Sequence, residues 1–225
     1  MFKEPASNED KQRKDTQDGT FIDWRKVFYK YAAVGFNSPD ESLIEELESG
    51  LFFEGLARFS DKASLEVHED IRKLERSFAQ KKPSDYFTAL QAEYVSLFVS
   101  DLGGPRVHPY ESIHVDGTVQ GESMRKVADF YSRSGLVKKE NFSDMPDHIA
   151  VELEFLHKLS KLEGRESLEL SYGFLDEHLL KWFPGFADQV RRETDHSFYR
   201  VLAKWVNLGL IEDKKFLEGE LQDGN

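Results

Sequence analysis

Residues 144–148 read Asp-Met-Pro-Asp-His, and together with Glu152 they hold groups that can accept protons, bind cations or cap a helix. His148 and Glu152 are four residues apart, so a helix starting here would place both side chains on one face. That pair could hydrogen-bond a ligand or, with further ligands, hold a metal for hydrolysis. The segment also suits a helix N-terminus, with Asp144 as the cap, a proline in the first turn and Asp147 near the positive end of the helix dipole.

A metal centre needs more ligands than this segment supplies. The chain has 7 histidines but no H-E-x-x-H pair, and His108 and His114 could reach His148 only through folding. We therefore expect no metal and no resident cofactor. A metal-dependent hydrolase that uses His148 and Glu152 is kept as an alternative function.

Other catalytic signatures are missing from the sequence. The chain has no cysteine, which excludes disulfides, thiolate metal ligands and cysteine nucleophiles. It has no G-x-S-x-G motif, and Gly103-Gly104-Pro105 lacks the Lys-Ser/Thr pair that completes a phosphate-binding loop. The sequence therefore offers no signature of nucleophilic catalysis or of a phosphate-binding loop.

The composition describes an acidic chain of 225 residues, with a net charge of -12 and a pI near 5.1. Nucleic-acid binding needs a basic footprint, so we expect no nucleic-acid partner. An acidic surface does attract and steer a basic partner. No apolar run approaches the ~18 residues that span a bilayer. We therefore expect a cytoplasmic protein without stable membrane insertion.

The elements that must position these residues are helices. Apolar residues recur at spacings of three and four, and no stretch alternates as a strand does. The pattern predicts an all-α, single-domain bundle of roughly eight to ten helices. Residues 101–117 hold glycines and prolines without a helical period, which predicts a long central loop or hinge. Residues 1–20 are predicted to be a disordered leader, 21–211 the helical domain and 212–225 an acidic flexible tail.

Several helix ends can be predicted from local signals. Ser38 is expected to cap a helix with Pro39 in its first turn. Residues 146–162 are expected to form one helix. Phe183-Pro184-Gly185 is expected to separate two later helices. Most aromatic residues have core spacing, whereas Tyr110 lies in the predicted loop, where it could line a groove for an apolar peptide.

Five motifs follow one another in the chain at characteristic spacings. They are Tyr94-x-x-Leu97-Phe98, Pro109-Tyr110-Glu111-Ser112, Phe130-Tyr131 with Gly135, Pro146-Asp147-His148-Ile149-x-x-Glu152-Leu153-x-Phe155, and His178-Leu179-x-x-Trp182 followed by Phe186 and Phe198-Tyr199. Together they resemble the TorD/DmsD/NarJ family of cytoplasmic chaperones dedicated to molybdoenzyme maturation. The resemblance covers about residues 85–205. Asp147 and His148 match the end of the family's E-P-x-D-H hinge motif, whereas Asp144 and Met145 replace its Glu and Pro.

The resemblance implies an all-helical chaperone without a catalytic centre or cofactor. Its expected partner is the twin-arginine signal peptide of a molybdoenzyme catalytic subunit, held back from export until the molybdenum cofactor is inserted. Such proteins are monomers or domain-swapped dimers. The residues expected to bind the peptide are Tyr110, Glu111, Ser112, Asp144, Asp147, His148 and Glu152.

The chemistry of such a peptide fits these residues. Two arginines followed by an apolar stretch need carboxylates beside an apolar groove, and an Arg–carboxylate pair can be bidentate and charge-assisted. A second possibility is a NarJ-like assembly factor, whose client subunit is not exported and does not depend on twin arginines.

Overall fold

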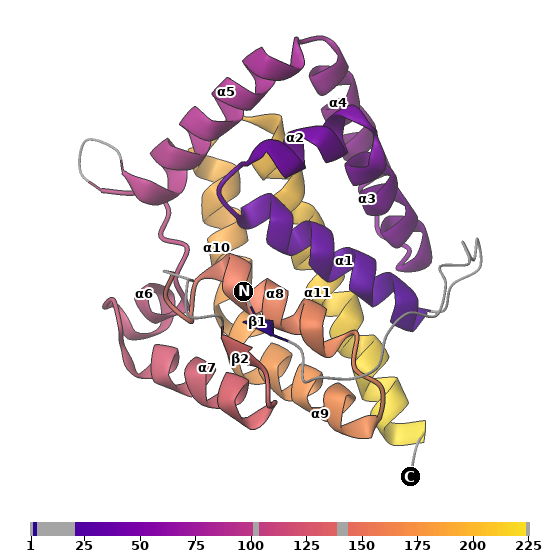
Figure 1. Cartoon of the computed structure of the whole chain (residues 1–225), viewed down its shortest axis with the longest axis vertical. Helices are drawn as coiled ribbons and strands as arrows, with labels where there is room; N and C mark the ends of the chain where they lie inside the picture. Colours follow the sequence, from indigo (N-terminus) through magenta and orange to yellow (C-terminus); the bar gives the residue numbers. More distant parts are fainter. Residues whose placement is uncertain (1, 4–20, 101–103, 139–143, 224–225) are drawn as a thin grey trace.

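The structure of the protein is a computed structural model, which describes residues 2–3, 21–100, 104–138 and 144–223 (Figure 1). The helices are α1 (Phe21–Phe36), α2 (Glu41–Glu48), α3 (Leu51–Lys62), α4 (His68–Ala79), α5 (Pro83–Tyr94), α6 (Glu111–Asp116), α7 (Glu122–Arg133), α8 (Ile149–Leu159), α9 (Arg165–Phe174), α10 (Leu180–Glu193) and α11 (Ser197–Asp223), with π-helical turns η1 (Val95–Val99) and η2 (Leu175–Leu179). Strands β1 (Phe2–Lys3) and β2 (Val137–Lys138) pair antiparallel. The predicted all-α, single-domain class is confirmed.

The helices are arranged in two parts around a central group. Helices α2 to α5 form the upper part of Figure 1, and α6, α7 and α9 form the lower part. Helices α1, α8, α10 and α11 lie between them, and α1 packs against α8, α3 and α11. Residues 104–110 lead into α6, and α6 packs against α10 of the central group.

Aromatic rings fill the centre of the body. The ring of Phe28 stacks on Phe59 with centroids 4.4 Å apart and meets Trp205 edge-on at 4.9 Å. A Cβ atom on Gly209 of α11 would lie 2.3 Å from the Phe28 ring, so the helices approach closely only because this residue is glycine. Since α1 and α11 come from opposite ends of the described chain, this packing closes the fold.

The predicted flexible tail is wrong for the residues that the structure describes. Helix α11 continues to Asp223, with Asp213 and Leu217 fully buried. Asp213 accepts hydrogen bonds from the guanidinium of Arg25 and from the Tyr29 hydroxyl, the latter at 2.5 Å. This buried ion pair joins the last helix to the first, which the acidic composition of the segment does not reveal. Most of the predicted leader, residues 4–20, lies outside the described residues.

The predicted break at Phe183-Pro184-Gly185 is also wrong. Helix α9, η2 and α10 follow one another directly, and Pro184 lies inside α10. An internal proline costs ~3 kcal/mol. Phe183 and Phe186 on either side of it are completely buried, and burial of each contributes about 1.5–3 kcal/mol. Packing therefore outweighs the local signal, and the chain turns at residues 194–196 instead.

Two other local predictions need correction. The cap of α2 is Asp40 rather than Ser38, and its side chain accepts from the backbone N–H of Leu43 at 3.0 Å. The segment predicted as a loop over residues 101–117 contains α6. Gly117, with φ of 71°, ends this short helix in a left-handed conformation.

Candidate functional site

A backbone bridge joins the two central motifs. Tyr110 and His148 face each other in an antiparallel β-bridge. The N–H of Glu111 donates to the Asp147 carbonyl at 3.0 Å, and the N–H of Ile149 donates to the Pro109 carbonyl at 2.9 Å. The bridge brings the predicted loop residues against the start of α8, although some 37 residues separate them in sequence.

His148, rather than Asp144, caps α8. Its Nδ1 atom accepts the backbone N–H of Ala150 at 3.2 Å, and its backbone is extended, as at an N-cap. Burial lowers the pKa of His148 below its ordinary value, although the charges of Asp144 and Asp147 oppose this shift. A neutral imidazole has the free lone pair that this cap requires. The predicted helix 146–162 accordingly starts at Ile149.

The side chain of Asp147 accepts a hydrogen bond from α6 rather than from α8, the helix that follows Asp147 in the chain. Its Oδ2 atom accepts the backbone N–H of Ser112 at 3.0 Å, in the first turn of α6. Asp147 also directly precedes the N-cap of α8, so it lies at the N-terminal end of that helix, where it was predicted. Asp147 is completely buried, and its hydrogen bond to the backbone of Ser112 holds α6 against the start of α8.

Two carboxylates lie beneath this bridge, each against an aromatic donor from the later helices. The Nδ1–H of His178 donates to both oxygens of Glu111, at 2.9 and 3.1 Å. The indole Nε1–H of Trp182 donates to Glu152 Oε2 at 3.2 Å. We refer to the buried set Glu111, Asp147, His148, Glu152, His178 and Trp182 as the acidic cluster.

His178 and Trp182 were not among the predicted peptide-binding residues. They belong to η2 and α10, lie four residues apart and are both buried. Polar aromatic residues on a buried helical face need partners, because an unsatisfied donor in the core costs about 1–3 kcal/mol. The spacing His-x-x-x-Trp, which places both side chains on one helical face, is therefore a signal that could have identified them.

Glu152 is the most perturbed acid of the cluster. Burial raises its pKa well above the usual range, and the charges of Glu111 and Asp147 raise the pKa further, against the opposing hydrogen bond from Trp182. Burial and the neighbouring negative charges therefore favour the protonated form of Glu152 over the carboxylate. A protonated Glu152 can donate to the carboxylate of Glu111, and this hydrogen bond is a further cause of its raised pKa.

The seven predicted site residues gather in one place, but at two depths. Tyr110 and Asp144 are partly exposed. The other five are buried, and they are Glu111, Ser112, Asp147, His148 and Glu152. The carboxylates predicted to line an open groove therefore lie under the surface in this conformation. A backbone amide donates to one oxygen of Asp147, an indole to one oxygen of Glu152 and an imidazole to both oxygens of Glu111.

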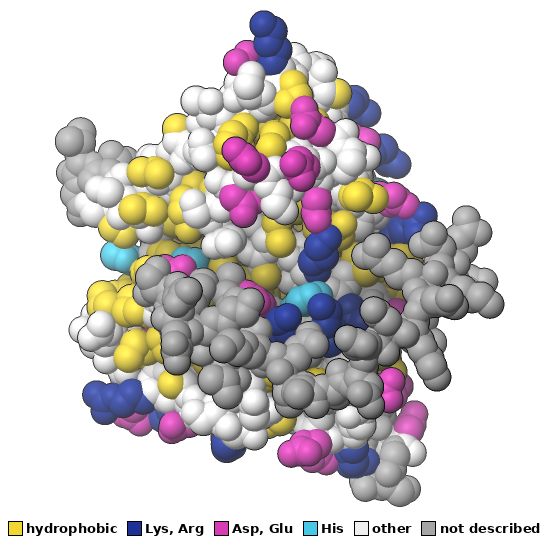
Figure 2. All heavy atoms as spheres, in the orientation of Figure 1, with side chains coloured by type: hydrophobic (Ala, Val, Ile, Leu, Met, Phe, Trp, Pro, Cys, Tyr) yellow, Lys and Arg dark blue, Asp and Glu magenta, His cyan; other side chains and the backbone are white. Residues whose placement is uncertain are grey.

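Four exposed valines belong to the segments before and after residues 104–110. Val95 and Val99 of η1 are 48% and 54% exposed, and Val115 and Val119, in and just after α6, are 50% and 49% exposed. We call these four residues the valine surface. Figure 2 shows hydrophobic side chains gathered at the left of the view, over α5 and α6, with histidine between them.

The connection between the two halves of the valine surface is held in place by hydrogen bonds. The N–H of Val107 donates to the Leu97 carbonyl at 2.8 Å. His114 donates through Nε2 to the His108 carbonyl at 2.8 Å, and its ring stacks on Trp182 with centroids 5.1 Å apart. Trp182 thus donates to Glu152 and also stacks on His114, and His114 in turn donates to the connection at His108.

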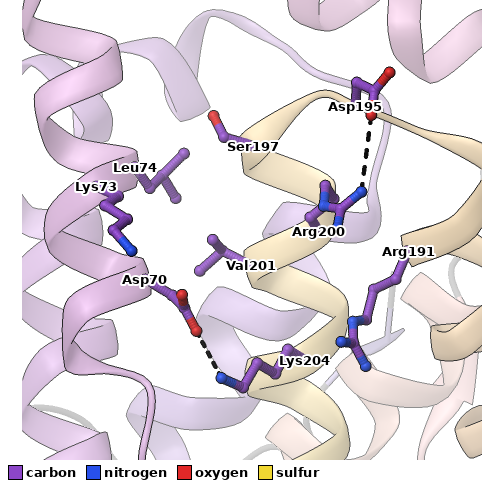
Figure 3. Close-up of a pocket in the computed structure, with 9 residues that line it drawn as sticks. All are labelled: Asp70, Lys73, Leu74, Arg191, Asp195, Ser197, Arg200, Val201 and Lys204. Carbon is purple, nitrogen blue, oxygen red and sulfur yellow. Dashed lines mark hydrogen bonds and ion pairs between the residues drawn. The ribbon is translucent and has the colours of Figure 1, made fainter.

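A cavity of about 390 Å³ between α4 and α11 is lined mainly by cations (Figure 3). Lys204 pairs with Asp70 at 2.6 Å, and Arg200 pairs with Asp195 at 3.8 Å. Arg191 and Lys73 also line it, so four basic and two acidic side chains face this space. A cationic peptide would be repelled from such a cavity.

Metal and membrane sites were sought along the described segments. Within residues 21–100, 104–138 and 144–223, no three His, Asp or Glu side chains converge as a metal site. In the same segments, every helix is too short or too polar to cross a bilayer.

Comparison with known proteins gives the chain a family. A family model described as nitrate reductase delta subunit matches residues 60–188, which is more than half of the chain. The chain belongs to this family. The family resemblance recognised in the motifs is therefore confirmed.

Individual relatives of this family extend the match. A chaperone protein TorD from Vibrio cholerae serotype O1 is 24% identical over 88% of this chain and 93% of its own. A chaperone protein TorD from Photobacterium profundum is 29% identical over 62% of this chain and 69% of its own. The crystal structure of a putative redox enzyme maturation protein from Archaeoglobus fulgidus has the same fold, with a TM-score of 0.50, 24% identity and coverage of 92% and 99%.

These relatives are named as chaperones and as a maturation protein, not as catalysts. The protein is accordingly not an enzyme, as the family resemblance implied. The alternative of a hydrolase that uses His148 and Glu152 is wrong. Both residues are engaged in the fold, His148 as the cap of α8 and Glu152 as the acceptor of Trp182.

Proposed function

We propose that this protein is a chaperone for a molybdoenzyme catalytic subunit. It binds the N-terminal twin-arginine signal region of that subunit in the cytoplasm and assists insertion of the molybdenum cofactor before export. The family and the chaperone relatives that cover most of the chain support this proposal. The valine surface and the partly exposed carboxylate of Asp144 support the choice of ligand.

The observation that carries the proposal is the pairing of opposite chemistries at one place. A signal peptide presents two arginines and an apolar stretch. The valine surface is half-exposed apolar area of the kind that marks interaction sites. The bridge at Tyr110 and the loop at Asp144 add a phenol and a carboxylate that are partly exposed. The net charge of -12 steers a cationic peptide towards the protein.

The proposed roles of the seven site residues follow from their depth. Tyr110 and Asp144 contact the peptide arginines at the surface. Ser112, Asp147 and His148 fix the bridge and the first turns of α6 and α8. The carboxyl groups of Glu111 and Glu152 are reached only when α6 moves, since both are buried with partners from η2 and α10.

Isothermal titration with a synthetic twin-arginine peptide tests the proposal. We expect Asp144→Asn to weaken binding by about three- to tenfold, as for loss of a partly exposed charge-assisted pair. Glu166→Gln is the matched control, because Glu166 is an exposed carboxylate on α9. Absence of peptide binding by the unchanged protein would overturn the proposal, and equal affinity of Asp144→Asn and Glu166→Gln would remove Asp144 from the site.

The description of the matching family favours one variation of this function. A nitrate reductase delta subunit-like factor would assemble a client that does not depend on twin arginines. Arginine forms planar, bidentate pairs that lysine cannot form. Exchange of Arg-Arg for Lys-Lys in the peptide should therefore weaken binding to a twin-arginine receptor and leave an assembly factor of the second kind unaffected.

A further inference from the structure

A second cavity of about 390 Å³ opens between α7 and η2, next to the acidic cluster. Its lining includes Phe130, Arg133 and His178. His178 is the residue that donates to Glu111, so one wall of the cavity is the outer side of the acidic cluster. The cavity thus gives solvent a route to this part of the cluster, although the carboxylate of Glu111 itself stays buried.

The guanidinium group of Arg133 forms part of the wall of this cavity. The Cζ atom of Arg133 lies 4.0 Å from the centroid of the Phe130 ring, well within the range of a cation–π contact. Phe130 is itself fixed by edge-on contacts with Phe174 at 5.6 Å and with His178 at 5.1 Å. The ring is therefore a rigid, buried platform with one face turned to a cation.

Two carboxylates stand beside this platform. Asp129 of α7 and Glu177 of η2 line the cavity and are exposed. Among the described residues, neither forms an ion pair within 4.0 Å, and Arg133 forms none either. The guanidinium of Arg133 thus stacks on the ring without using the nearby charges. An arginine that entered from outside could stack on Phe130 and also pair with a carboxylate, which would give it contacts that Arg133 does not make.

The geometry points to a guanidinium-binding subsite between α7 and η2, which Arg133 occupies in the free protein and an arginine of a bound cationic peptide occupies in the complex. This inference rests on the proposed function, since it names a place for one of the two peptide arginines. The cavity between α4 and α11 has four basic and two acidic side chains on its wall, so it is not a candidate for the same ligand (Figure 3). In the cavity between α7 and η2, the charges of Asp129 and Glu177 match those of Lys126 and Arg133. Lys126 is already paired with Glu122 at 2.9 Å.

Titration of the full chain with the twin-arginine peptide tests the subsite. The double variant Asp129→Asn/Glu177→Gln should weaken binding by about fivefold or more, because both carboxylates near the platform lose their charge. The double variant Glu166→Gln/Glu220→Gln removes the same charge from exposed positions on α9 and α11 and should change affinity less than about twofold. Equal effects of the two double variants would overturn the inference.

Arg133 offers a test in the opposite direction. Arg133→Ala empties the face of Phe130, so it should tighten peptide binding by about threefold. Arg125→Ala removes the same charge from an exposed position of α7 that does not line the cavity, and it should tighten binding less. If both variants tighten peptide binding equally, the change in net charge alone explains the effect, which contradicts the subsite.

A small probe separates this inference from the proposed function. N-acetyl-arginine methylamide, followed by NMR, should shift the ring signals of Phe130 and His178, and its lysine counterpart should shift them less. If this probe binds and the signal peptide does not, the subsite stands and the proposed function fails. If the peptide binds and the probe leaves both rings unshifted, the subsite fails and the proposed function stands.

Discussion

Trp182 donates its indole hydrogen to Glu152 across 3.2 Å, and this bond joins α10 to α8 inside the acidic cluster. Glu152 is completely buried, and Trp182 is 2% exposed. Burial and the nearby carboxylates of Glu111 and Asp147 raise the pKa of Glu152 and so favour its neutral form. A buried carboxylic acid of this kind makes the stability of the cluster depend on pH.

Glu152→Gln tests the protonation of this acid. In the unfolded chain Glu152 loses its proton near pH 4.3, whereas its raised pKa keeps it protonated in the folded protein. The stability that it contributes is therefore complete below about pH 4.3 and is lost as the pH rises towards the folded pKa. Glutamine cannot ionise, so the free energy of unfolding of Glu152→Gln, relative to the unchanged protein, should rise in urea titrations as the pH increases from about 4.3 towards the folded pKa.

Glu152→Ala tests the packing and the hydrogen bond of the same side chain. It should lower the free energy of unfolding by ~2–4 kcal/mol, because it leaves a cavity and an unpaired Trp182 donor. Glutamine keeps an acceptor for Trp182 and a donor for Glu111. An unchanged pH dependence in Glu152→Gln would show that Glu152 is ionised in the folded protein.

His157 should make the protein lose stability in mild acid. Burial and then the charge of Lys161 lower the pKa of His157 to about 4, while its Nδ1–H donates to the Lys26 carbonyl at 3.0 Å. The unfolded histidine gains its proton near pH 6.5, so stability falls as the pH drops from about 6.5 to 4, by about 3 kcal/mol in all. His157→Gln, which keeps an N–H donor, should remove this part of the slope. A difference between the two proteins that does not vary with pH would contradict the assignment.

Asp213 should be essential for the fold although it lies in an acidic C-terminal segment. Its removal in Asp213→Ala leaves Arg25 buried and without its charge partner, and loss of one partner of a buried pair costs about 3–5 kcal/mol. Asp223→Ala, at an exposed position of the same helix, should change the free energy of unfolding by less than about 0.5 kcal/mol. Chemical denaturation of both variants checks this, and equal stability would contradict the role of α11 in the core.

Two glycines of α11 should respond oppositely to alanine. In Gly209→Ala the new Cβ atom would lie 2.3 Å from the Phe28 ring, and such overpacking costs about 1–3 kcal/mol. A Cβ atom on Gly219 meets nothing within 4 Å, so Gly219→Ala should stabilise the helix by about 0.5–1 kcal/mol. Thermal unfolding gives both values. Stabilisation by both changes would mean that α1 and α11 are packed less closely than they are here.

The sequence by itself determined the fold class and the family, because both depend on patterns that repeat along the chain. The three- and four-residue spacing of apolar residues predicts helices wherever it persists, and the motifs around Tyr110, His148 and Trp182 carry the resemblance. The Ser38 cap and the break at Pro184 were predicted wrongly. Those local signals compete with tertiary packing, which placed Pro184 between two buried phenylalanines.

Only the tertiary structure decided how deep each site residue lies and what it contacts. The sequence predicted Glu111, Asp147 and Glu152 as members of one site, but it placed them at an open groove. Folding brings Ser112, His178 and Trp182 to these acids from other segments, and the donors compensate for burial of the carboxyl groups. Burial and pairing arise between residues far apart in the chain, so no local pattern encodes them. The same reason hid the ion pair of Arg25 with Asp213 until α1 and α11 were seen side by side.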